Sequence, residues 1–186
     1  MGFIFNRYPP PSRRAIFYAR EWALNSGASE IDSIHLLCAL TVEKTMRANT
    51  VLKLDERFPE EAARLRAMTE SAVRRDIPLG REVKIILARA TEEADEQDSY
   101  WIDTDHLALA ILREQDCAAA ARLRGAGIRI EEARKQFDET ADQREVYGPV
   151  PAFWRLAKPI SRVGHTAGIL YLLLVVILIS LVGRGC

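Results

Sequence analysis

The chain has 186 residues, of which 48% are hydrophobic and 28% charged, a balance typical of a globular protein. This length suits one domain with a short appendage and is too small for two full domains with an ATPase core. The net charge is zero, but residues 147–186 contain four basic and no acidic side chains, so residues 1–146 carry −4. Because nucleic-acid binding needs a dense basic face, no nucleic-acid partner is expected.

The first ten residues are predicted to form an N-terminal tail. They lack the cationic start and apolar run of a signal peptide, and Asn6 stands where a myristoylation signal needs Ser or Thr. We therefore expect no targeting device at this end of the chain.

Residues 11–76 and 77–143 are predicted to be two copies of one helical unit. A shift of 71 residues superimposes residues 16–54 on residues 87–125, and eleven of the 39 aligned positions are identical. Apolar residues recur at intervals of three and four in both copies, which indicates helices. Each unit needs the other to cover its apolar face, so the sequence predicts an all-α bundle of two pseudo-symmetric repeats.

The boundaries of several helices are marked by individual residues. Asp32 and Asp103 stand at matching positions and are predicted to cap the helices that follow them. Pro59 with two glutamates after it predicts a helix over residues 59–75, and a last helix is expected over residues 130–143. No stretch alternates with period two, which favours the all-α class.

The C-terminal part is predicted to be a basic, proline-containing linker over residues 144–163 and a transmembrane helix over residues 164–183. These last 20 residues contain no Asp, Glu, Lys or Arg, and at about 1.5 Å per residue they span roughly the 30 Å of a bilayer core. Only the tail of residues 184–186 follows, so we expect a C-terminal tail anchor. The positions assigned to the anchor are Gly164, Gly168, Leu172, Ile177 and Leu181.

The charges around this segment predict its orientation. Three basic residues precede the span and one follows it, so the positive-inside rule places the folded domain in the cytoplasm, and a single-pass protein of a bacterial inner membrane is expected. Gly164 and Gly168 form a small-x-x-x-small pair, which favours a weak transmembrane homodimer.

Two matching motifs carry a resemblance to a known family. Residues 102–107 have the sequence Ile-Asp-Thr-Asp-His-Leu, residues 111–114 have Ile-Leu-Arg-Glu, and Cys117 is followed by alanines; residues 31–37 have Ile-Asp-Ser-Ile-His-Leu-Leu. The chain over residues 10–143 therefore resembles the N-terminal (Clp R) domain of the Clp chaperone-unfoldases. The resemblance implies a double-repeat helical domain that binds adaptors, degradation signals or substrate segments for an attached ATPase ring.

The resemblance also implies what the chain lacks and what it has changed. There is no G-x-x-x-x-G-K-[ST] motif, so the chain looks like the recognition domain without its motor, and neither a nucleotide cofactor nor ATPase or protease activity is expected. Some family members bind phosphorylated arginine through the acidic residue before each histidine. That residue is Asp105 in the second repeat but Ile34 in the first, which implies that one such pocket is lost.

Seven residues are predicted to contact a partner. Four of them lie at the matching helix starts, and three are aromatic residues that the two repeats do not share, as expected for an interface. The alternatives are that the histidines have structural roles and that the aromatic residues pack at the periphery of the core. The seven residues are Trp22, Ile34, His35, Tyr100, Trp101, Asp105 and His106.

The sequence thus predicts a membrane-tethered module that binds a protein or peptide in an adaptor or substrate-recognition role. The expected partners are a Clp unfoldase or its client, together with the lipid bilayer. One alternative is a self-associating assembly protein of the membrane, and another is a thiol enzyme built on Cys38 and His35. Three cysteines without a C-x-x-C pair argue against a disulfide framework or a structural zinc ion, and no metal is expected.

Overall fold

The computed structural model describes residues 6–67, 76–152 and 154. Within these residues the chain forms α-helices, one short 3-10 helix and a single β-bridge between Ile31 and Leu79, which confirms the all-α class. No described helix is long and apolar enough to cross a bilayer. The predicted span over residues 164–183, with its assigned anchor positions, lies outside the described residues.

The helices fall into two series. The first repeat contains α1 (Pro10–Asn25), α2 (Ser33–Ala39), α3 (Arg47–Leu52), α4 (Leu54–Arg57) and α5 (Pro59–Arg66). The second repeat contains α6 (Arg81–Glu96), α7 (Thr104–Arg113), α8 (Ala118–Gly125), α9 (Ile130–Glu139) and the 3-10 helix η1 (Ala141–Gln143). The 71-residue shift superimposes both ends of α1 on those of α6 and the starts of α2, α3 and α5 on those of α7, α8 and α9, so the double repeat is confirmed.

The turns repeat as well as the helices. Gly27 (φ 72°) and Asp98 (φ 57°) hold the same left-handed position after α1 and α6, a conformation that costs an aspartate more than a glycine. The N–H of Ile31 donates to a carbonyl at the entry to the second repeat, and the N–H of Ile102 donates to the carbonyl of Arg7 at the entry to the first, at 2.9 and 2.7 Å. Each repeat therefore anchors the entry of the other.

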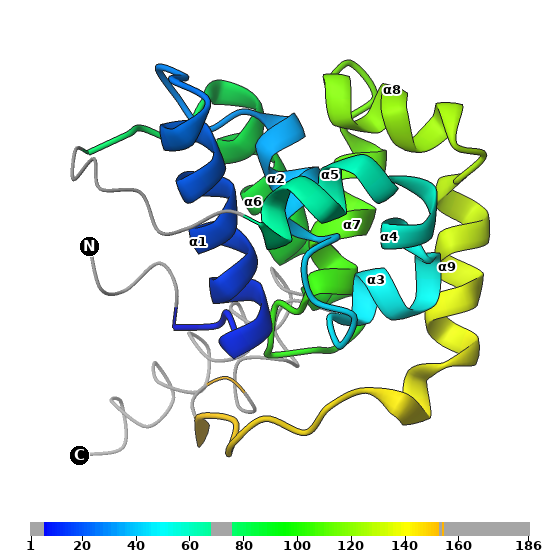
Figure 1. Ribbon diagram of the computed structural model, residues 1–186. Helices are drawn as coiled ribbons and strands as arrows, with labels where there is room; N and C mark the ends of the chain where they lie inside the picture. The colour runs from blue at the N-terminus through cyan, green and yellow to red at the C-terminus, as the bar shows by residue number, and fades with distance from the viewer. Residues whose placement is uncertain (1–5, 68–75, 153, 155–186) are drawn as a thin grey trace, which may run out of the picture. The chain divides into compact units, whose positions relative to one another are not determined.

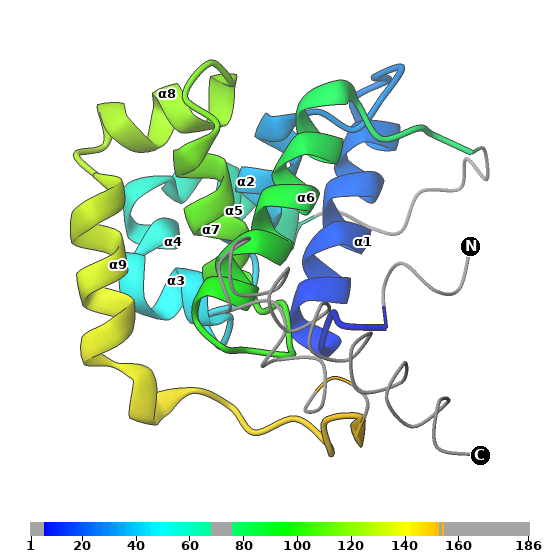
Figure 2. The ribbon, with the colours of Figure 1, turned by 180° about the vertical axis from the view of Figure 1, so that it is seen from behind.

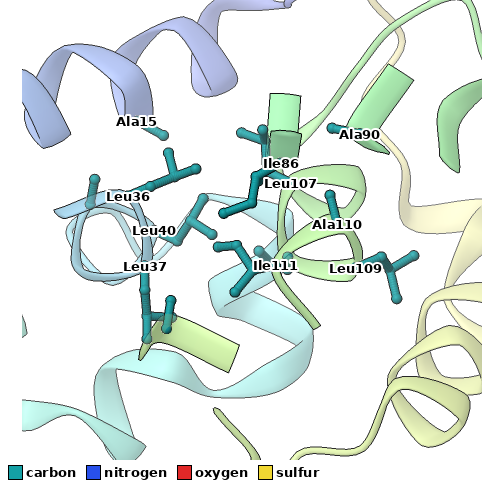
Figure 3. Packing of buried hydrophobic residues seen from close by; sticks show 14 of the residues in the cluster. Ala15, Leu36, Leu37, Leu40, Ile86, Ala90, Leu107, Leu109, Ala110 and Ile111 are labelled. Carbon is teal, nitrogen blue, oxygen red and sulfur yellow. The ribbon is translucent and has the colours of Figure 1, made fainter. Parts of the chain in front are cut away.

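Helices α2 and α7 form the centre of the core. Figure 3 shows Leu36 of α2 and Leu107 and Ile111 of α7 gathered in one cluster, and all three are at most 1% exposed. The long helices α1 and α6 pack against α2 and α7 respectively (Figures 1 and 2). Ala15 and Ala90 lie fully buried on these long helices, where their small size lets the helices approach. The two repeats thus share one core.

Three predicted boundaries differ from the structure. Tyr8 is buried and its hydroxyl donates to the carbonyl of Leu87 at 3.3 Å, so packing begins inside the predicted tail. The helix that begins at Pro59 ends at Arg66, and residues 68–75 of its predicted range lie outside the described residues. The helix expected over residues 130–143 ends at Glu139 and is followed by η1. One compact unit covers residues 1–147 and a second covers residues 148–186.

Candidate functional site

The starts of α2 and α7 are built in the same way. The backbone N–H of Asp103 donates to Nδ1 of His106 at 2.9 Å, and the Asp103 carboxylate accepts from the N–H of Thr104 at 2.6 Å. At α2, the N–H of Asp32 donates to Nδ1 of His35 at 3.2 Å, and the N–H of His35 donates back to the Asp32 carboxylate at 3.0 Å. Both helices therefore begin with a capping box in which the imidazole accepts through Nδ1.

The two histidines differ in their surroundings. His106 is fully buried, and burial lowers its pKa to about 4, so the ring is neutral at pH 7. Its Nε2 atom is buried with no hydrogen-bond partner among the described residues. Nε2 of His35 instead lies 3.3 Å from the hydroxyl of Ser26. His106 has no solvent-accessible surface that a partner could contact. In both repeats the histidine stabilises the start of a helix.

The start of α7 encloses a buried ion cluster. One oxygen of Asp105 lies 2.9 Å from Nε of Arg47 and 2.9 Å from a terminal nitrogen of Arg144, and the other accepts from the N–H of His106 at 2.8 Å. Burial alone raises the pKa of Asp105, but the charge that His106 carries when protonated and the charges of the two arginines outweigh burial and hold the pKa below its ordinary value. Asp105 is thus an ionised, fully buried carboxylate whose cationic partners come from the chain itself.

Arg47 ties three elements together at this cluster. Its side chain is 7% exposed, and its terminal nitrogens donate to the carbonyls of Phe137 and Thr140 at 2.7 and 2.8 Å. These bonds join the start of α3 to the end of α9, while Nε binds Asp105 of α7. Because its terminal nitrogens and Nε each have an acceptor, Arg47 is a structural cation.

Residues 140–147, which we call the C-terminal arm, close this site. Arg144 donates to the amide oxygen of Gln97 at 2.7 Å as well as to Asp105. The hydroxyl of Tyr147 donates to Asp103 at 2.7 Å, and its ring lies 6.0 Å from the ring of Trp101, edge to face. The pKa of Asp103 is raised by burial and by the nearby Asp105. The hollow that remains beside Asp103 and Tyr147 has a volume of about 80 Å³.

A reciprocal pair of hydrogen bonds relates this site to the first repeat. The N–H of Ala48 in α3 donates to the hydroxyl of Thr104 in α7 at 3.1 Å, and the N–H of Ala119 in α8 donates to the hydroxyl of Ser33 in α2 at 3.4 Å. The 71-residue shift aligns Ala48 with Ala119 and Ser33 with Thr104, so the two hydrogen bonds are equivalent. The start of α8 therefore sits over α2 as the start of α3 sits over α7.

At the first repeat the equivalent position is open. A groove of about 550 Å³ lies beside Ser33 and the starts of α6 and α8, and we call it the junction groove. Ala118 of α8 stands there where the site at the start of α7 has Arg47 of α3, and Ile34 stands where that site has Asp105. Five acidic residues and one basic residue, Arg81, line the groove. The acidic residues are Glu30, Asp32, Glu82, Glu114 and Asp116.

Local contacts hold the acidic lining in place. Glu82 accepts from the hydroxyl of Ser33 at 2.6 Å, and Glu114 forms an ion pair with Arg89 at 3.0 Å. A Cβ atom added to Gly80 would lie 2.9 Å from the carbonyl oxygen of Ile31 and 3.0 Å from the carboxylate of Glu30. Glycine is therefore required at the start of α6 for the first repeat to approach this closely.

The predicted aromatic residues lie in two separate contacts. Trp22 packs edge to face on His35, with ring centroids 6.3 Å apart. Tyr100 and Trp101 pack on each other at 4.9 Å, and Trp101 continues to Tyr147. Trp22 and Trp101 are half-buried and Tyr100 is buried. These rings serve the two helix starts separately, and a role for them in partner contact stays a prediction.

The remaining predicted site residues also have defined places. Ile34 is half-buried at the start of α2, whereas Asp105 is 0% exposed behind the C-terminal arm, so it meets no partner directly while the arm is in place. Cys38 is 2% exposed, and burial raises its pKa to about 12, which leaves the thiol protonated at neutral pH and unsuited to nucleophilic catalysis. Among the residues described, no group of three His, Cys, Asp or Glu side chains is placed to hold a metal ion.

The sequence prediction missed the residues that close the site at the start of α7, which we call the second-repeat site. Arg47 lies 58 residues from Asp105 along the chain and Arg144 lies 39 residues away, and neither belongs to a motif. The pairing of Arg47 with Ala118 under the 71-residue shift was the one available signal. The linker predicted over residues 144–163 includes Tyr147, which belongs to the first compact unit.

Comparison with known proteins supports the fold. Residues 79–168 match the family model described as the Clp repeat (R) N-terminal domain. The N-terminal domain of the caseinolytic protease associated chaperone ClpD from Arabidopsis thaliana is 19% identical, with a TM-score of 0.56 over 74% of this chain and 99% of that one. The N-terminal domain of the ClpV1 ATPase from E. coli is 17% identical, with a TM-score of 0.56 over 80% and 93%.

A third similar structure is named "Peptide from EAEC T6SS Sci1 SciI protein"; it is 19% identical, with a TM-score of 0.55 over 81% of this chain and 99% of that one. No curated protein matches the chain. These likenesses establish a Clp N-domain-like fold built from two repeats.

Proposed function

We propose that this chain is a membrane-tethered Clp N-domain-like module that binds a protein or peptide, in an adaptor or substrate-recognition role and without ATPase or protease activity of its own. The observation that carries the proposal is the junction groove. It is the open counterpart of the site at the start of α7, which the chain fills with its own Arg47 and Arg144. A Clp unfoldase or its client is the proposed partner.

Two further observations support a binding role. The fold is that of N-terminal domains from Clp chaperones, and one similar structure carries a SciI peptide in its name. In addition, the described thiols are buried, and burial raises the pKa of Cys38 and of Cys117. A thiol-based reaction at the helix starts therefore has no support.

The tether rests on the sequence of residues 164–183, which contains no charged side chain. Anchoring restricts the domain to a thin layer and raises its effective concentration for other membrane-bound partners. The proposed orientation, with the domain in the cytoplasm, follows from the basic residues that precede the segment. Deletion of residues 164–186 is expected to release the protein from the membrane fraction; retention there would contradict the tether.

The groove is tested by site-specific crosslinking in the full chain. A photo-crosslinking amino acid replaces Ile85, which lines the groove, and in a matched control it replaces Lys135, which is exposed on α9. We expect one discrete crosslinked protein from position 85 and none from position 135 in native membranes. The same products from both positions, or none from either, would contradict the proposal.

Self-association in a membrane assembly is the second candidate, and the described surface gives it little support. Within the described residues the exposed large hydrophobic side chains are Phe17, at 44%, and Val146, at 95%. An obligate homodimer interface needs a larger apolar patch than two side chains. Light scattering of the full chain in detergent distinguishes the two candidates, since stable oligomers without a partner favour assembly.

A further inference from the structure

The hollow beside the C-terminal arm and the junction groove are lined by residues at equivalent positions of the two repeats. The 71-residue shift pairs Asp103 with Asp32, Arg47 with Ala118 and Thr45 with Asp116. Both helix starts therefore face a groove of one design. Its free volume is about 550 Å³ at the start of α2 and about 80 Å³ at the start of α7.

The C-terminal arm lies in the groove at the start of α7. Glu145 and Tyr147 of the arm line the same hollow as Asp103. The pKa of Arg14 in α1 is raised by its hydrogen bond with Glu43 and, less strongly, by the charge of Glu145, so the arm reaches α1. Figures 1 and 2 show this course, from the end of α9 toward the start of α1. The arm thus occupies, from within the chain, a groove that the other helix start leaves open.

Residues 144–147 are held in this groove by side chains. In the part of the chain that the structure describes, no backbone hydrogen bond joins these four residues to an α-helix. Arg144 and Tyr147 bind Asp105 and Asp103, but Nε of Arg144 is buried without a partner among the described residues. Val146, between them, is 95% exposed. A segment with so few buried contacts opens at a lower free energy than the fold beneath it.

The site beneath these residues has support of its own. Asp105 is bound by Arg47, and His106 closes the capping box with Asp103, in both cases without the arm. Arg47 is also held by the carbonyl of Phe137 in α9. Removal of residues 144–147 from the groove therefore exposes two carboxylates to solvent and leaves α7 folded.

We propose that residues 144–147 form a detachable strap, which lifts from the groove at the start of α7 as one unit while the surrounding helices stay folded. One of the two equivalent grooves is open in the closed chain, and both are open once the strap lifts. The use of the second groove rests on the proposed binding function, whereas the motion of the strap does not. The second compact unit begins at Gly148, so a force on that unit reaches the strap before any helix.

Hydrogen exchange of the full chain in detergent, followed by nuclear magnetic resonance in urea below the unfolding transition, tests the strap. The amides of Thr104 and His106 lie beneath it, and Leu109 lies deeper in α7 and is 0% exposed. We expect exchange at Thr104 and His106 to change little with urea, because a local opening exposes little surface. Exchange at Leu109 is expected to follow the full urea dependence of unfolding. The same dependence at all three amides would overturn the inference.

A matched pair of substitutions assigns this local opening to the strap. Tyr147→Phe removes the bond to Asp103, whereas Val146→Ala trims a neighbouring side chain that is almost fully exposed. We expect Tyr147→Phe to speed exchange at Thr104 and His106 by about tenfold and Val146→Ala by less than about twofold. Equal effects would contradict the inference, because the opening would then be fraying of the helix start.

Trypsin gives an independent readout, because cleavage after Arg144 requires this residue to leave Asp105. Under native conditions the cleavage rate follows the population of the opened chain. Mass spectrometry of the fragment 1–144 is expected to show cleavage about tenfold faster in Tyr147→Phe than in Val146→Ala. Equal rates in the two variants would rule out the strap. Neither measurement uses a partner, so a crosslink at position 85 tests the proposed binding function separately.

Discussion

The starts of α2 and α7 share a backbone and a capping box but differ in what covers them. At α7, Arg47 and Arg144 neutralise a buried aspartate, and the C-terminal arm seals the site. At α2, an isoleucine replaces the aspartate and an alanine replaces the arginine, so the junction groove stays open. The difference shows that a duplicated fold can close one copy of a site with its own side chains and leave the other copy open.

The largest expected effect falls equally on both repeats, because they share one core. Leu36→Asp and Leu107→Asp each place an unpaired charge at a position that is at most 1% exposed. Each substitution is expected to cost more than about 4 kcal/mol and to unfold the domain. Thermal melting followed by circular dichroism measures this. A normal melt for one of the two variants would show that the repeats do not share a core.

The next effect separates the two helix starts. Asp105→Ala leaves Arg47 buried without its carboxylate and is expected to destabilise the chain by about 3–5 kcal/mol. The matched substitution Asp32→Ala removes a half-exposed helix cap and is expected to cost about 1 kcal/mol. Urea denaturation of the full chain in detergent gives both values. Equal losses would mean that the buried ion cluster adds nothing to the second repeat.

Acid is expected to weaken the second repeat through His106. Its pKa is about 4 in the folded chain and near 6.5 when unfolded, so the unfolded chain binds more protons as the pH falls through this window. Stability is therefore complete above about pH 6.5 and falls by up to about 3 kcal/mol toward pH 4. The lowered pKa of Asp105 adds a further loss below that range, while the raised pKa of Asp103 opposes it.

Denaturation midpoints measured between pH 7 and pH 5 test this prediction. His106→Gln is the control, because it removes the titrating ring and is expected to flatten the dependence whatever it does to stability at pH 7. A slope that His106→Gln leaves unchanged would assign the acid sensitivity to other groups.

The smallest effect concerns the arm. Tyr147→Phe removes the hydroxyl that donates to Asp103 at 2.7 Å and keeps the ring against Trp101. A loss of about 1–2 kcal/mol is expected, since the acceptor is a buried carboxylate. Tyr18→Phe is the control, because its hydroxyl bonds a less buried carboxylate, that of Glu43. A larger loss for Tyr18→Phe would contradict the view that the arm seals the second repeat.

Much of the fold was predictable because short-range sequence patterns mark the repeat. The 71-residue shift, the caps at Asp32 and Asp103 and the start at Pro59 all act within one helical turn, and the structure contains each of them. The closure of the second-repeat site was not predictable, because it depends on contacts of Asp105 with arginines distant in sequence. The sequence shows Ala118 at the position equivalent to Arg47, so the missing arginine was predictable. Only the structure shows that a groove results there.

The most direct test of the difference between the helix starts is the exchange of backbone amide hydrogens in the full chain, measured by nuclear magnetic resonance. We predict slower exchange at Thr104 and His106, which the C-terminal arm covers, than at Ser33 and His35, beside the open junction groove. Equal exchange at both helix starts, or slower exchange at the start of α2, would contradict the account.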